Sequence, residues 1–82
     1  MVNVGFKNYV NDDKIIVVVD CTIKSMPIIR AINNARDMGM VIDVTMGRTT
    51  NSVIFTDSDH VILSHLGGPT ITKRIEGAKK NA

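Results

Sequence analysis

The chain has 82 residues and a formal net charge of +2, and 44% of its residues are hydrophobic. This length fits a single domain, residues 1–82, and the apolar content argues against intrinsic disorder. So small a charge does not by itself predict a nucleic-acid binder, which usually carries a pronounced basic patch. The longest uninterrupted apolar run, residues 15–19, is far shorter than the roughly 20 residues that cross a membrane, so no membrane partner is expected.

Cys21 is the only cysteine, which excludes an intrachain disulfide. Together with the lack of a recognisable signal peptide, it favours a cytoplasmic location. A lone cysteine is usually a small hydrophobe, and nothing in the sequence places a histidine beside it to make a nucleophile. No other catalytic constellation is present, so we do not expect an enzyme.

The N-terminal half predicts two strands and one helix. Residues 2–6 are expected to form a short strand, residues 11–13 a turn, and residues 15–19 a second strand that is apolar at every position and requires cover on both faces. The helix should begin near residues 25–27, since serine is a good N-cap and proline is tolerated in the first turn. Gly39 suits the left-handed position that follows a helix. The apolar stripe of this helix comprises Ile28, Ile29, Ile32 and Ala35.

The C-terminal half predicts strands at residues 40–45, 52–56 and 61–64 and a last helix at about residues 70–78. The first two of these strands are expected to pair as a hairpin whose tip is residues 47–51. The element order therefore predicts an α+β fold with a small, mainly antiparallel sheet of about five strands, one central helix and a short C-terminal helix.

The predicted hairpin tip carries the most informative polar residues. Gly47 permits close approach of the backbone, and Arg48 offers a planar fork of donors that suits phosphate. Thr49, Thr50 and Asn51 add neutral donors. Two interpretations stay open for this turn: a plain solvated connection, or an anion-binding site.

Other polar clusters favour structural roles. The segment with Asp57, Asp59 and His60, together with His65, lacks the glycine and distant glutamate of a calcium loop and the ligand spacing of a zinc site. A turn whose side chains bond their own backbone is favoured there, so we predict no metal and no other cofactor.

Residues 67–70 could hold a phosphate before a helix but lack the lysine of a P-loop. Asp43 faces the rim of a strand or pairs with an arginine across a subunit contact. Lys73, Arg74, Lys79 and Lys80 form a second basic patch, for which a solvated helix face is the default interpretation.

Much of the chain resembles a known family. The matching segments are residues 35–40, Ile42-Asp43, Gly47-Arg48 and the run TDSDHVILS at residues 56–64, and the likeness extends back to residues 3–6 and Asn8. Together they resemble the RemA-like family of small bacterial DNA-binding regulators, named for control of extracellular matrix genes. The resemblance implies a transcriptional regulator of the biofilm matrix, associated with the nucleoid, that binds double-stranded DNA as a ring-like homo-oligomer.

The resemblance also implies which residues contact DNA. The family associates DNA binding with an arginine at the position of Lys14 and with two arginines after the glycine of the hairpin. Arg48 matches outright, Lys14 matches in charge, and Thr49 does not match. Thr50 and Asn51 would add neutral contacts to the DNA backbone. Pro27 matches a family proline at the helix start, and this chain is two residues longer between Val19 and Pro27.

Assembly is also expected from the residues themselves. Three strands are apolar at consecutive positions, and one good helix with one poor helix cannot cover both faces of a five-strand sheet, so we infer a homo-oligomer. The alternative to DNA binding is a structural or protein-binding homo-oligomer of the same fold. The missing hairpin arginine and the low net charge favour that alternative.

Overall fold

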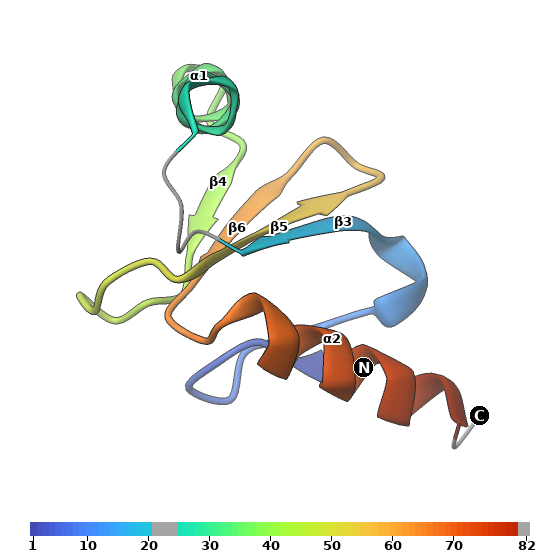
Figure 1. Ribbon diagram of the computed structural model, residues 1–82. Coiled ribbons are helices and arrows are strands. Elements are labelled where there is room, and N and C mark those ends of the chain that lie inside the picture. Colours follow the sequence, from blue (N-terminus) through green and yellow to red (C-terminus); the bar gives the residue numbers. More distant parts are fainter. Residues whose placement is uncertain (21–24, 81–82) are drawn as a thin grey trace.

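The computed structural model describes residues 1–20 and 25–80 (Figure 1). Cys21 lies outside the described residues. The elements in chain order are β1 (Val2–Asn3), β2 (Tyr9–Val10), the 3-10 helix η1 (Asp12–Lys14), β3 (Ile15–Asp20), α1 (Met26–Asp37), β4 (Val41–Asp43), β5 (Ser52–Thr56), β6 (Val61–Ser64) and α2 (Gly68–Lys80). The predicted α+β class is therefore confirmed.

The strands form two sheets instead of the single sheet of about five strands predicted. The larger sheet has the order β3-β5-β6-β4, and β1 pairs with β2 in a separate antiparallel ribbon. β3–β5 and β5–β6 are antiparallel, whereas β4 runs parallel to β6. The predicted hairpin between β4 and β5 is wrong, because β6 lies between them. All four residues of β6 are buried, so this strand takes an interior place with two partners.

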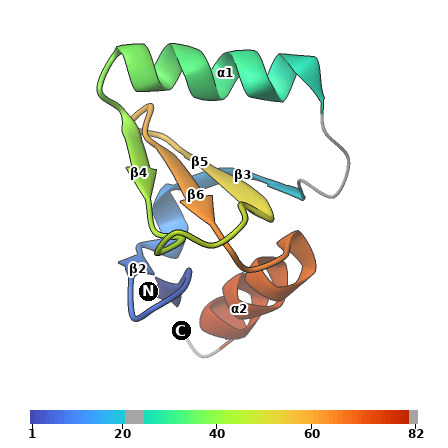
Figure 2. The same cartoon turned by 90° about the vertical axis from the view of Figure 1, so that its left-hand side faces the viewer.

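Helix α1 covers one face of the larger sheet, as Figure 2 shows. Its end carries a Schellman motif in which Met40 N–H donates to the Ala35 carbonyl at 2.8 Å and Gly39 N–H donates to the Arg36 carbonyl at 3.0 Å. Gly39 has the left-handed φ of 71° that this motif requires, so the predicted helix end is confirmed. The core beneath α1 comprises Ala35, Val53, Val61 and Leu63.

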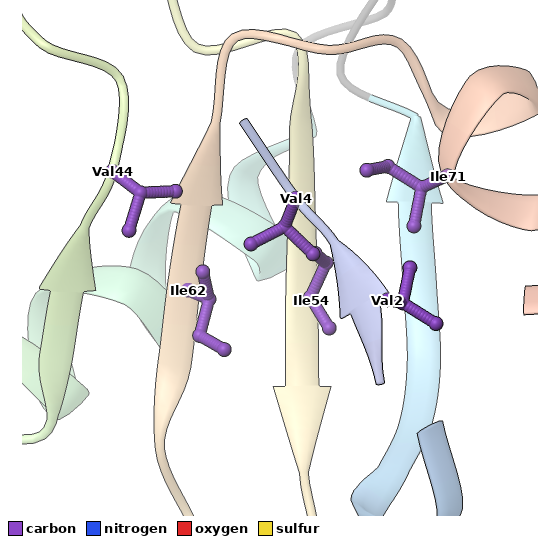
Figure 3. Close-up of a cluster of buried hydrophobic side chains, with 6 residues drawn as sticks. All are labelled: Val2, Val4, Val44, Ile54, Ile62 and Ile71. Atoms are coloured by element: carbon purple, nitrogen blue, oxygen red, sulfur yellow. The ribbon is translucent and has the colours of Figure 1, made fainter. Parts of the chain in front are cut away.

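The opposite face is covered by α2 and the N-terminal segment. Their shared core comprises Val2, Val4, Val44, Ile54, Ile62 and Ile71 (Figure 3). Helix α2 begins earlier than predicted, at Gly68, because Pro69 is compatible with a first helical turn. A Cβ at Gly68 would lie 2.8 Å from the Cβ of Asp20, so only glycine lets α2 approach β3 this closely. The two faces are thus covered by one chain.

The exposed apolar residues of the larger sheet lie on its two edge strands. On the edge strand β3, Ile16 is 64% exposed and Val17 is 45% exposed. On the opposite edge, Ile42 of β4 is 45% exposed. The expectation that one chain cannot cover both faces is therefore wrong, and the exposed apolar residues lie on edge strands instead.

Candidate nucleic-acid interface

Four of the five predicted site residues, Arg48, Thr49, Thr50 and Asn51, lie on the β4–β5 loop, residues 44–51, which crosses the carboxyl end of β6. Figure 2 shows this loop passing the arrowhead of β6. Val44 N–H donates to the Leu63 carbonyl at 3.0 Å, and Asn51 N–H donates to the Ser64 carbonyl at 2.9 Å. The Asn51 side-chain amide adds a 2.8 Å bond to the His65 carbonyl. Both ends of the loop are thus tied to β6, and Asn51 has a structural role in addition to any ligand contact.

Asp43 shapes the start of the loop. Its Oδ1 accepts hydrogen bonds from the Thr45 hydroxyl at 2.6 Å and from the Thr45 backbone N–H at 2.8 Å. These two bonds, the hydroxyl first, hold the pKa of Asp43 below its ordinary value. Asp43 therefore forms an Asx turn within its own chain. The role observed is thus local. The sequence had left open two other roles for Asp43, a position at the rim of a strand and a pair with an arginine across a subunit contact.

The loop then turns through a left-handed segment that exposes Arg48. Met46 has φ 54° and Gly47 has φ 81°, and Arg48 N–H closes the turn on the Thr45 carbonyl at 3.1 Å. A Cβ at Gly47 would meet no described atom within 4 Å, so glycine is favoured there by its conformation and not by lack of space. Arg48 and Thr49 are exposed, and Thr50 is half-buried.

A surface cavity of about 410 Å³ opens beside this loop. Its lining comprises Gly47, Arg48, Thr49, Asn51 and His65. The guanidinium of Arg48 and the neutral donors of Thr49 and Asn51 are groups that bind phosphate oxygens. The structure therefore brings together three of the five predicted site residues around one cavity.

Two residues that the sequence did not single out as ligand contacts belong to this cavity or border it. His65 lines the cavity, and its ring lies 4.5 Å from the ring of Phe6, centroid to centroid. The Arg48 Cζ atom lies 5.6 Å from the centroid of Phe6, within the range of a cation–π contact. The sequence separation of these residues hides their proximity, and the only local signal is an aromatic residue directly after Gly5.

Lys14, the other predicted cation, lies at the far end of the sheet. Ile15 pairs with Thr56 and Asp20 pairs with Ser52, so Lys14 and the β4–β5 loop are at opposite ends of β5. The Lys14 Nζ atom lies 3.7 Å from Oδ2 of Asp57. Within one chain, Lys14 therefore does not join Arg48 in a single site.

The segment from Asp57 to His60 is a tight turn with internal hydrogen bonds. The Thr56 hydroxyl accepts from His60 N–H at 3.2 Å, and Ser58 Oγ lies 2.8 Å from Nδ1 of His60. Asp59 occupies the left-handed region with φ 66°. Across residues 1–20 and 25–80, no three histidine, cysteine, aspartate or glutamate side chains gather as metal ligands do. The side chains of Thr56, Ser58 and His60 are thus used in local bonds.

The start of α2 and its basic face also have local partners. The Cγ atom of Asp20 lies 3.4 Å from the position of a Cβ at Gly68, which brings an acidic side chain to the helix N-terminus where a phosphate would bind. Arg74 donates from Nη1 to the Asn3 carbonyl at 2.8 Å and so ties α2 to β1.

In the part of the chain that the structure describes, neither helix is long and apolar enough to span a bilayer.

Comparison with known proteins establishes the family. The model of the RemA-like family, described as extracellular matrix regulatory protein A-like, matches residues 1–75. The chain belongs to the RemA-like family. The match includes Phe6, the β4–β5 loop and His65 and ends inside α2, before Lys79 and Lys80.

Relatives of this RemA-like protein carry regulatory names. A protein of Halothermothrix orenii, named as a candidate regulatory protein, is 47% identical over 81 residues, which are 99% of this chain and 94% of that protein. A protein of Desulforamulus reducens with the same name is 49% identical over 75 residues, 92% of this chain and 81% of its own length. The RemA-like protein is thus a member of a family of regulatory proteins.

Proposed function

We propose that this RemA-like protein regulates transcription by binding double-stranded DNA through the surface around the β4–β5 loop. The observation that supports this proposal is the cavity beside that loop, where exposed Arg48 lies among the neutral donors of Thr49 and Asn51. Such a site fits one phosphate of a DNA backbone, because a guanidinium binds phosphate through two parallel hydrogen bonds.

Arg48 is the main contact in this proposal. Thr49, Thr50 and Asn51 contribute neutral hydrogen bonds that position the backbone without reading its sequence. Lys14 acts at a separate point, because it lies at the other end of β5. It reaches the same DNA only where an assembly places several chains along the duplex.

Assembly into a ring-like homo-oligomer completes the proposal. The larger sheet has two different apolar edges, Ile16 and Val17 on β3 and Ile42 on β4. A head-to-tail contact between unlike edges repeats with rotation and can close a ring. An apolar groove of about 460 Å³, lined by residues that include Ile16, Met38 and Phe55, adjoins the β3 edge. A ring repeats Arg48 once per subunit, so that weak single contacts add up through avidity.

The second candidate is a structural or protein-binding homo-oligomer of the same fold. Two observations favour it: the neutral Thr49 beside Arg48 and the net charge of only +2. This candidate requires the same edge contacts but no anion at the cavity.

A gel shift of the purified protein on mixed-sequence duplex DNA at low salt separates the two candidates, with light scattering as the companion measurement. We expect a retarded complex and a discrete species larger than a dimer. An assembled protein that leaves the duplex unshifted at the lowest salt supports the structural oligomer instead.

A further inference from the structure

Phe6 has an unusual backbone and an exposed ring. Its φ of 49° and the φ of 63° at Lys7 lie in the left-handed region, where bulky side chains are rare. The turn is held in this form by Asn8, whose backbone N–H and side-chain amide donate to the Gly5 carbonyl at 2.9 Å and 2.8 Å. Phe6 is nevertheless 43% exposed, so burial alone does not explain why the chain keeps this conformation.

The ring contacts two of the residues that line the cavity beside the β4–β5 loop. It packs against the imidazole of His65 at 4.5 Å with an interplanar angle of 31°, and the guanidinium carbon of Arg48 lies 5.6 Å from its centroid. Three segments far apart in the sequence therefore meet at Phe6.

Gly5 packs closely against the imidazole of His65. A Cβ at Gly5 would lie 3.0 Å from both Nδ1 and Cε1 of His65, and Gly5 has a φ of 126° that other residues rarely adopt. The Nδ1 atom of His65 is buried without a hydrogen-bond partner among the described residues. Packing against Gly5 and Phe6 therefore holds the imidazole in place, and the imidazole in turn supports the ring of Phe6.

We infer that Phe6 is a positioning residue that holds the Arg48 guanidinium at the proposed phosphate site, an inference that rests on the proposed function. A cation–π contact uses the face of the guanidinium and leaves its edge, which carries the N–H donors, free for phosphate. The contact also restricts the rotamers of Arg48 before DNA arrives, which lowers the entropy lost on binding. Phe6 thus raises DNA affinity without adding a charge.

The test compares Phe6→Leu and Phe6→Tyr in titrations of one mixed-sequence duplex across a salt series. Leucine has the same left-handed strain and comparable bulk but no π-face, whereas tyrosine keeps the π-face and is the matched control. Phe6→Leu should weaken binding by about 2–5-fold per engaged subunit and leave the slope of log K against log salt unchanged. Phe6→Tyr should bind as the wild type does.

A double-mutant cycle separates positioning from a merely structural role. In an Arg48→Ala background, Phe6→Leu should have no further effect on affinity, because the group that it positions is gone. An equal loss with and without Arg48 would overturn the inference, as would wild-type affinity in Phe6→Leu.

A readout without DNA distinguishes failure of this inference from failure of the proposed function. The Arg48 Hε resonance should show a ring-current shift that Phe6→Leu removes and Phe6→Tyr retains. If that shift is present but the wild type binds no duplex, Phe6 holds Arg48 as inferred and the DNA proposal is wrong. If Arg48→Ala loses DNA binding and the Arg48 resonance is the same in wild type and Phe6→Leu, the DNA proposal stands and the positioning role is wrong.

Discussion

Hydrogen bonds at both ends of the β4–β5 loop set the position of Arg48. Asp43 fixes the start of the β4–β5 loop through Thr45, and Asn51 fixes its end through the His65 carbonyl. The left-handed pair Met46 and Gly47 then turns the chain so that Arg48 is exposed. The guanidinium therefore extends from a loop that is tied at both ends, which favours a preorganised contact.

The Asp43 carboxylate should make stability depend on pH. Its pKa is lowered in the folded state, mainly by the Thr45 hydroxyl, so its contribution is present above its unfolded pKa of 3.8 and is lost as pH falls through the folded pKa. Asp43→Asn should lower the melting temperature at pH 7 by roughly 2–4 °C, the equivalent of about 0.5 kcal/mol for an exposed charged bond. Thermal melts from pH 7 to pH 2 should show the gap to wild type closing at the acid end. A constant gap would mean that the charge of Asp43 has no part in the effect.

A cation at position 49 should raise the affinity of the proposed site for DNA. Thr49 is neutral and lines the cavity, so Thr49→Arg adds a permanent cation next to Arg48. We expect tighter DNA binding and a steeper salt slope, with about 0.5–1 kcal/mol gained per engaged subunit. The matched control is Asn33→Arg, which adds the same charge at an exposed position on α1. Equal affinity of the two variants at every salt concentration would show that position 49 does not face DNA.

The polar residues of the β4–β5 loop could be singled out from the sequence, but the residues that pack against them could not. Glycine, arginine and small polar residues in one short loop left a solvated turn and an anion site open, and Arg48, Thr49 and Asn51 line one cavity. Phe6 and His65 could not be added from the sequence, because tertiary packing alone brings them to Arg48. The same packing places Lys14 beside Asp57 at the other end of the sheet.

At the scale of elements, α1 was the most predictable part. Its proline, apolar stripe and terminal glycine are local signals, and the helix observed is Met26–Asp37 with Gly39 in the left-handed region. The partner of β4 was predicted to be β5 and is β6, because the sequence of a short apolar strand does not specify which strand it pairs with. β6 lies between β4 and β5 and is buried along its whole length.

The helix end provides a test in which two glycines are compared. A Cβ at Gly39 or at Gly77 meets no described atom within 4 Å, so neither substitution to alanine causes a clash. Gly39→Ala should lower the free energy of unfolding by about 1–2 kcal/mol, because Gly39 has φ 71°. Gly77→Ala, inside α2, should raise it by about 0.5–1 kcal/mol. Urea denaturation at one protomer concentration measures the free energy of unfolding of both variants. A loss of stability in both would contradict the different roles given to Gly39 at the helix end and Gly77 inside α2.

At the scale of the whole molecule, the apolar sheet edges are the feature that one chain leaves incomplete. Ile16→Lys places a charge on the β3 edge, where Ile16 is 64% exposed, and should dissociate the proposed assembly while leaving the protomer folded. Tyr9→Lys is the control, since Tyr9 is 56% exposed on β2, in the separate two-stranded sheet. Light scattering should show a lower mass for Ile16→Lys and the wild-type mass for Tyr9→Lys. Unchanged mass in both variants would place the subunit contact elsewhere.

DNA binding at Arg48 is tested most directly by its salt dependence. Wild type and Arg48→Ala are titrated with one duplex from low to high salt, with Arg30→Ala as control because Arg30 is an exposed arginine on α1. We predict that Arg48→Ala assembles normally, binds far more weakly, and has a slope of log K against log salt that is flatter by roughly 0.9 for each engaged subunit. Affinity and slope equal to those of wild type in an intact Arg48→Ala assembly would contradict the proposed site.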